Sequence, residues 1–136
     1  MSGDGERLAR ALHAAYNAHD AGAAAALYAA DGRHVEIATG GGKSGPVAIA
    51  AGLAGLLDAF PDAHWAASAF IASGDLVAVP YLLTGTLQAP FGPFEPAGQR
   101  LELAGVHVVH ARDGAIAVCD DYWDAGTFGR QLRPAG

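Results

Sequence analysis

The sequence predicts an α+β domain in which helices pack on one face of a curved antiparallel sheet. Two observations carry this prediction. Helical segments with one short strand among them fill the N-terminal half, and two hairpins of long strands fill the rest. A run of helices followed by a run of strands is typical of α+β folds. The 136 residues suit one domain, over residues 1–136.

Three helices are expected in the N-terminal half. Residues 3–20 place apolar side chains three and four positions apart as far as Tyr16, which is the repeat of an amphipathic helix. A short helix is expected over residues 21–30. A third begins after Ser44, a candidate N-cap, and ends at Pro61.

Strands are expected where apolar and polar residues alternate between turn signals. The motifs SGD and RDG each separate two long runs and indicate hairpins. The segments GGGKSGP and APFGPFEPAGQR are expected to be loops. Pro80 lies inside a strand and implies a sheet edge or a bulge, because proline lacks a ladder donor. The expected strands are residues 32–39, 64–72, 76–87, 101–111 and 115–124.

Composition and charge exclude several classes of function. The formal net charge is −6, and Lys43 and seven scattered arginines form no basic patch, so nucleic acid is not expected as a partner. The single cysteine, Cys119, excludes an internal disulfide. Neither a signal peptide nor a membrane span is apparent, so we expect a cytoplasmic protein without a membrane partner. Hydrophobic residues make up 51% and charged residues 16%, which favours a large core or a covered apolar pocket.

The stretch CDDYWD places three aspartates at the end of the last expected strand, where aspartate is disfavoured. If Asp113 and Gly114 form a two-residue turn, His107 pairs with Asp120. Aliphatic side chains mixed with a few polar groups are typical of a ligand pocket, and one face of this hairpin has that mixture. The face would carry Leu103, His107, Val109, Val118, Asp120, Tyr122 and Asp124.

Structural alternatives remain open for these acids. Asp120 and Asp121 would also suit an edge strand, where charges prevent aggregation, and Asp124 would suit the cap of the following turn. A slip of one residue in the pairing would move the acids of one strand to the opposite face.

Further residues are candidates for contacting a ligand. His34 and Glu36 share one face of the first strand, which is either a pocket mouth or an exposed polar face. Tyr16 belongs either to the core or, through its hydroxyl, to a cavity wall. The remaining aromatic residues would either line the pocket or form core, with core favoured for Phe70; they are Trp65, Phe70, Tyr81, Phe91 and Phe94, of which the last two lie in a loop suited to a lid.

Metal binding and nucleophilic catalysis are not expected. His107 and His110 lie three residues apart on a strand and therefore point to opposite faces. The sequence has no GxSxG motif, and Cys119 is expected on the face opposite His107.

Several short motifs resemble one family when taken in order. They are FPD after the third helix, LTGT in the first hairpin, DG.I in the second, and WD…RQL near the end. From about Leu8 to Leu132 the chain resembles the SnoaL-like polyketide cyclases of the nuclear-transport-factor-2-like superfamily, which also contains ketosteroid isomerase and limonene epoxide hydrolase. The resemblance implies a cone-shaped fold, in which a bent antiparallel sheet is wrapped by three helices around an apolar pocket.

The resemblance also implies roles for residues. Asp124 would be the general acid/base of an intramolecular aldol ring closure that needs neither metal nor cofactor, with His107 beside it. Asp120 and Tyr122 would assist because they lie on the same predicted face, although Asp120 stands where relatives commonly have an aromatic residue. Relatives tend to carry an amide side chain two residues before the histidine, where this chain has Gly105, so the space is expected to serve a larger ligand or a different reaction.

The function expected from these features is a cofactor-independent small-molecule enzyme of the SnoaL-like cyclase type. Epoxide opening or isomerisation on the same fold, and small-molecule binding without catalysis, remain alternatives. The expected partners are a small apolar or polyketide-like ligand and a second copy of the chain, forming a homodimer through the sheet.

Overall fold

The computed structural model describes residues 3–134, which form four helices and an open curved sheet of seven strands. The helices are α1 (Gly3–Asn17), α2 (Ala21–Ala26), α3 (Pro46–Ala59) and α4 (Ala125–Leu132). The strands are β1 (Tyr28–Glu36), β2 (Gly41–Ser44), β3 (His64–Ala67), β4 (Ile71–Ser73), β5 (Leu76–Thr86), β6 (Arg100–Arg112) and β7 (Ala115–Trp123). The predicted α+β fold class is therefore confirmed.

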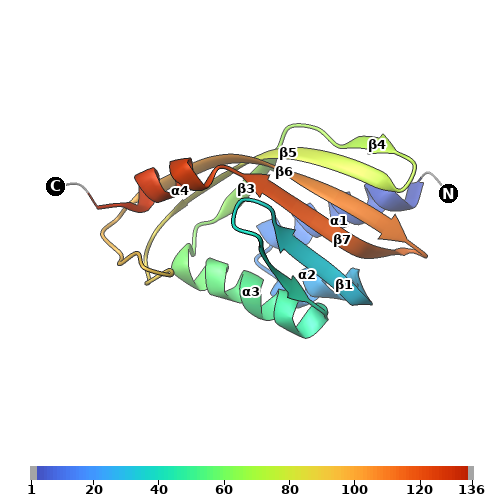
Figure 1. Ribbon diagram of the computed structural model, residues 1–136, viewed down its shortest axis with the longest axis horizontal. Coiled ribbons are helices and arrows are strands. Elements are labelled where there is room, and N and C mark those ends of the chain that lie inside the picture. Colours follow the sequence, from blue (N-terminus) through green and yellow to red (C-terminus); the bar gives the residue numbers. More distant parts are fainter. Residues whose placement is uncertain (1–2, 135–136) are drawn as a thin grey trace.

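The strands follow one another in the order β2-β1-β7-β6-β5-β3, and β4 also pairs with β5. All pairs are antiparallel except β1 with β7, which is parallel. Figure 1 shows β5, β6 and β7 as long neighbouring strands, with α1 behind them and α3 running along the side of β1. The first and last strands of the chain's β-structure are thus brought side by side.

The core lies between the helices and one face of this sheet. Leu8, Leu12, Ala15 and Tyr16 of α1 are all buried, as their helical spacing predicts. They join a cluster that includes Phe60 after α3, Val79 of β5 and Ile116 of β7. None of the helices within residues 3–134 is long and apolar enough to cross a membrane.

Several local predictions were wrong. Residues 41–44 form β2 instead of a loop, and Tyr28 already belongs to β1 instead of a helix. The N-cap of α3 is Gly45, at a φ of 84°, and no side chain caps this helix, so Ser44 does not serve as the cap. The terminal helix α4 was not predicted, because its glycines and threonine favour a turn.

Pro80 lies opposite a break in the neighbouring strand. Ala67 of β3 pairs with Tyr81 and Ile71 of β4 pairs with Ala78, so the ladder along β5 is interrupted at Pro80. The carbonyl of Pro80 accepts a hydrogen bond from the Ser68 backbone N–H at 2.9 Å. The expected run over residues 64–72 is therefore two strands, which tolerates the missing proline donor.

Candidate active site

A cavity of about 460 Å³ lies between the sheet and the helices. Most of its wall is apolar and comes from α3, α4, the sheet and the loop before β6. The apolar lining residues are Ile49, Leu53, Leu56, Trp65, Leu83, Phe91, Leu103, Trp123 and Phe128. The polar side chains on the wall are Tyr16, His34, Glu36, Lys43, Tyr81 and Asp121. A few polar groups in an apolar cavity are typical of a small-molecule site.

The register of β6 and β7 decides which acid enters this cavity. The turn at Asp113-Gly114 forms as expected, with positive φ at both residues, and Arg112 pairs with Ala115. The register then shifts by one residue, because Ala111 pairs with Ile116 while His110 pairs with Val118. Beyond this bulge, His107 lies opposite Asp121. The predicted pairing with Asp120 is therefore wrong by one residue.

The shift moves the other predicted acids out of the cavity. Asp120 lies on the outer face, with its Oδ2 3.0 Å from Nε2 of His110. Asp124 is the N-cap of α4 and accepts hydrogen bonds from the Thr127 backbone N–H at 2.8 Å and its hydroxyl at 2.7 Å. These bonds lower the pKa of Asp124, which is a fully exposed carboxyl. The prediction that Asp120 and Asp124 lie in the pocket is therefore wrong, because the bulge shifts the register by one residue.

Two other predicted positions are corrected by the same shift. Tyr122 is 44% exposed on the outer face and does not line the cavity. Cys119 pairs with Val109 and is fully buried on the same face as His107, not on the opposite one.

Asp121 is the acid at the centre of the cavity wall, only 9% exposed. The Tyr81 hydroxyl donates to its Oδ1 at 2.7 Å. Nε2 of His107 lies 3.3 Å from Oδ2, and Nε2 of His34 lies 3.6 Å from the same oxygen. Burial by itself raises the pKa of Asp121, but the two histidines outweigh burial and hold that pKa well below its usual range. Asp121 is therefore ionised at neutral pH.

Gly105 makes room for the tyrosine that binds this acid. Gly105 of β6 pairs directly with Tyr81 of β5. A Cβ at Gly105 would clash with the Tyr81 ring and hydroxyl and would lie 2.7 Å from the Tyr122 carbonyl oxygen. The space that the missing side chain leaves thus holds the Tyr81 hydroxyl, where a larger ligand was expected.

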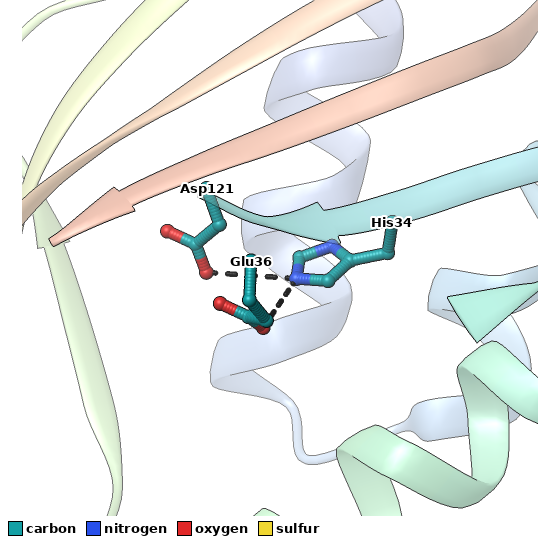
Figure 2. A group of neighbouring side chains, drawn as sticks. All are labelled: His34, Glu36 and Asp121. Atoms are coloured by element: carbon teal, nitrogen blue, oxygen red, sulfur yellow. Dashed lines mark hydrogen bonds and ion pairs between the residues drawn. The ribbon is translucent and has the colours of Figure 1, made fainter. Parts of the chain in front are cut away.

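His34 and Glu36 line the cavity beside Asp121, so the alternative of an exposed polar face does not apply. Figure 2 shows the His34 ring directed between the two carboxylates, and its Nε2 lies 2.8 Å from Oε1 of Glu36. The other Glu36 oxygen accepts from the Trp123 indole at 2.6 Å. Burial alone lowers the pKa of His34, but the surrounding groups, which include Tyr16 and both carboxylates, raise it well above its ordinary value. A protonated His34 thus links two acids.

These three residues are also the group, within residues 3–134, that could hold a metal ion. One ligand atom from each of His34, Glu36 and Asp121 lies within 4.8 Å of the others. Imidazole and carboxylate donors suit zinc and similar ions. A proton on Nε2 of His34 competes for the same place, since its raised pKa keeps the ring charged at neutral pH.

His13 is a functional candidate that the sequence reasoning missed. Its Nε2 lies 2.9 Å from Nδ1 of His107, and both side chains are buried. Burial, reinforced by His107, lowers the pKa of His13 to about 3, so this ring is neutral at pH 7. A signal was present, because His13 lies in the apolar stripe of α1 between Leu12 and Tyr16.

The pair of histidines fixes the proton positions around Asp121. Nε2 of His107 faces an ionised carboxylate, which favours a proton on that nitrogen. When His107 is neutral, its Nδ1 is then an acceptor, and Nε2 of His13 donates to it. His13 thereby favours the tautomer of His107 that carries its proton on Nε2, the nitrogen 3.3 Å from the Asp121 carboxylate.

The other aromatic candidates divide into two groups, because Phe70 and Phe94 pack against the core and do not line the cavity. Tyr16, Trp65, Tyr81 and Phe91 all line the cavity. Phe91 packs edge-to-face on Phe60 at 5.8 Å and on Phe128 at 6.0 Å between ring centroids, and of these three rings Phe91 and Phe128 line the cavity.

Comparison with known proteins decides the family. A family model described as SnoaL-like polyketide cyclase matches residues 6–132. The chain belongs to the SnoaL-like polyketide cyclase family. A search of curated proteins finds no match.

Solved structures share the fold of this SnoaL-like chain. A putative SnoaL-like polyketide cyclase from Jannaschia sp. CCS1 has a TM-score of 0.89 at 17% identity, covering 99% of this chain and 95% of that one. A hypothetical protein with a ketosteroid isomerase-like fold from Catenulispora acidiphila, in complex with trimethylamine, has a TM-score of 0.79 at 21% identity, covering 92% and 91%. TerC, co-crystallised with polyporic acid, has a TM-score of 0.78 at 22% identity, covering 95% and 98%. Structures of this fold therefore accommodate small molecules.

Proposed function

We propose that this SnoaL-like protein is an enzyme that catalyses an intramolecular aldol-type ring closure by acid–base chemistry of its own side chains. One observation carries the proposal: an ionised Asp121 lies on the wall of an apolar cavity, in contact with His107, His34 and Tyr81. The sequence-based assignment of this role to Asp124 is replaced by Asp121, since Asp124 is exposed at the cap of α4.

The proposed reaction begins with proton removal from carbon. The Asp121 carboxylate takes a proton from a carbon between two carbonyl groups, which breaks a C–H bond and leaves an enolate. The low pKa of Asp121 makes this transfer uphill, so stabilisation of the enolate has to supply the difference. The protonated His34, 3.6 Å from the same carboxylate oxygen, is the nearest cationic donor for the enolate oxygen.

The second step forms the ring. The enolate carbon attacks the second carbonyl carbon of the same substrate, and the resulting alkoxide takes a proton from His34. The proton held by Asp121 then returns to His34, which restores both groups. The apolar wall holds the two ends of the substrate together and excludes water from the enolate.

Each alternative function can be compared with the side chains that line the cavity. Epoxide opening by two acids usually has an arginine between them, and no arginine is among the lining residues that the structure describes. Isomerisation would use the same carboxylate and the same proton donor. Identification of the reaction product therefore distinguishes isomerisation from ring closure. Binding of an apolar ligand without catalysis does not require an ionised carboxylate, such as that of Asp121, in the cavity wall.

The test compares two neighbouring acids. Purified protein is incubated with a panel of aromatic polyketide-like β-keto esters, and cyclised products are identified by mass spectrometry and NMR. Asp121→Asn should lower turnover by about 10²- to 10⁴-fold, the usual range for losing a general base. Asp120→Asn, one residue along on the outer face, should stay within about twofold of the wild type, because its side chain lies outside the cavity. Equal turnover of wild type and Asp121→Asn would refute the proposal.

We also propose the homodimer through the sheet. The outer face carries a shallow groove lined by Ile37, Ala38, Ala104, Gly105, Val106, Tyr122, Trp123 and Asp124. Leu82 and Tyr122 are both more than 40% exposed on the sheet, which leaves apolar surface for a second copy to cover. Light scattering should give twice the mass of the chain, and Tyr122→Lys should shift it towards the monomer.

A further inference from the structure

Lys43 lies at the opening of the cavity on the same side of the sheet as the acid centre. It pairs directly with His34 across β2 and β1, and cross-strand partners share one face. Its side chain lines the cavity while remaining exposed. The methylene stem lies over Gly52 of α3, because a Cβ at Gly52 would lie 3.3 Å from Cε and 3.4 Å from Cγ of the lysine. The helix thus holds the stem and leaves the ammonium free to meet a ligand.

The ammonium of Lys43 has no carboxylate partner. Five arginines form ion pairs with acids on the surface, but no ion pair within residues 3–134 includes Lys43. The other ionisable side chains of the lining are His34, Glu36 and Asp121, and Nε2 of His34 lies 2.8 Å from the Glu36 carboxylate and 3.6 Å from the Asp121 carboxylate. The chain contains one lysine, and it is placed here.

We propose that Lys43 forms an anion subsite, and that the substrate is a small organic anion with an aromatic or otherwise apolar body. This inference rests on the proposed function and names its substrate class. A negatively charged oxygen binds the Lys43 ammonium at the mouth, and the apolar body lies against the leucine and aromatic walls.

The charge pattern also gives the substrate its orientation. The carboxylates of Asp121 and Glu36 repel an anionic group that enters first, whereas Lys43 attracts that group at the opening. The uncharged end is therefore the one that reaches Asp121. This arrangement brings a carbon acid, and not the charged group, against the base.

The experiment measures binding of three matched probes by isothermal titration calorimetry at low salt. The probes are 2-naphthoate, the neutral 2-naphthamide and the cationic 2-naphthylmethylammonium. In the wild type, the anion should bind about fivefold more tightly than the amide, the range of a partly exposed charged contact, and the cation should bind most weakly. Lys43→Met should remove the preference for the anion, and Lys43→Arg should retain it. Arg33→Met, an exposed basic residue of β1 outside the cavity, is the matched control and should keep it as well.

Three results would overturn the proposal: the amide or the cation binding as tightly as the anion, the preference surviving Lys43→Met, or no detectable binding of 2-naphthoate at millimolar concentration. The measurement needs no turnover, so its failure is distinct from failure of the catalytic proposal. Asp121→Asn should retain the preference for the anion even if it abolishes turnover.

Discussion

His107 and Asp121 face each other across β6 and β7, with Nε2 of the histidine 3.3 Å from Oδ2 of the aspartate. The bulge at Ala117 of β7 creates this contact, because without the shift the residue opposite His107 would be Asp120. His107 also contacts His13, and Asp121 also contacts Tyr81 and His34. A buried polar network of this kind stabilises the fold only while its members keep their partners.

Tyr81→Phe should reduce stability by about 1.5–3 kcal/mol, because it removes a buried hydrogen bond to a charged acceptor. Tyr122→Phe is the matched control, since the Tyr122 hydroxyl lies on the outer face and forms no hydrogen bond within residues 3–134, and it should change stability by less than about 0.5 kcal/mol. Urea denaturation of both variants measures the difference. Equal stabilities would show that the Tyr81 hydroxyl does not bind Asp121 in solution.

As the pH falls, the free energy of unfolding should decrease less in His13→Gln than in the wild type. The pKa of His13 is lowered to about 3 in the folded protein, whereas the unfolded chain takes up the proton near pH 6.5. The neutral ring therefore contributes stability that is fully present above pH 6.5 and is lost as pH falls towards 3, on the order of a few kcal/mol. Glutamine does not titrate and still offers a donor to His107.

The free energy of unfolding of the His13→Gln variant should be followed by urea denaturation between pH 7 and 4. The exposed His64→Gln is the control and should follow the wild-type profile. A His13→Gln profile as steep as that of the wild type would contradict the assignment of a buried neutral His13.

Gly105→Ala should destabilise the protein by about 1–3 kcal/mol, the usual cost of overpacking. The new methyl group would clash with the Tyr81 ring and with the backbone of β7. Gly55→Ala on α3 has open space around it and should raise stability by up to about 1 kcal/mol, because alanine favours helices over glycine. Thermal unfolding of the two variants should therefore shift in opposite directions. If Gly105→Ala left the thermal stability unchanged, the space beside Tyr81 would be larger than the structure indicates.

The sequence allowed the fold to be predicted because its signals were local. The spacing of Leu8, Leu12 and Tyr16 placed α1, and the Asp113-Gly114 turn placed the last hairpin. The resemblance carried by the ordered motifs was confirmed by the family match over residues 6–132. Four of the aromatic candidates, Tyr16, Trp65, Tyr81 and Phe91, line the cavity, whereas His107, which was expected on the pocket face, is fully buried beside Asp121 and is not among the lining residues.

The acid was missed because its position depends on a single bulged residue. No turn signal marks the bulge at Ala117, and a shift of one residue exchanges Asp120 and Asp121 between the two faces. The parallel pairing of β1 with β7, which brings His34 and Glu36 next to Asp121, joins segments more than 80 residues apart and leaves no local pattern. The unbulged register placed Asp124 on the pocket face and the resemblance gave it the catalytic role, although its capping role was visible as an alternative.

The ionisation of Asp121 tests the account most directly. Carbon-detected NMR of the aspartate carboxyls can follow each acid from pH 7 downwards, and the Asp121→Asn spectrum assigns the resonance. We predict that the Asp121 carboxyl stays ionised well below the ordinary aspartate pKa of about 3.9, because His107 and His34 hold its charge. A titration of Asp121 at or above that ordinary value would show that the histidines do not pair with it, and the proposed acid–base centre would be contradicted.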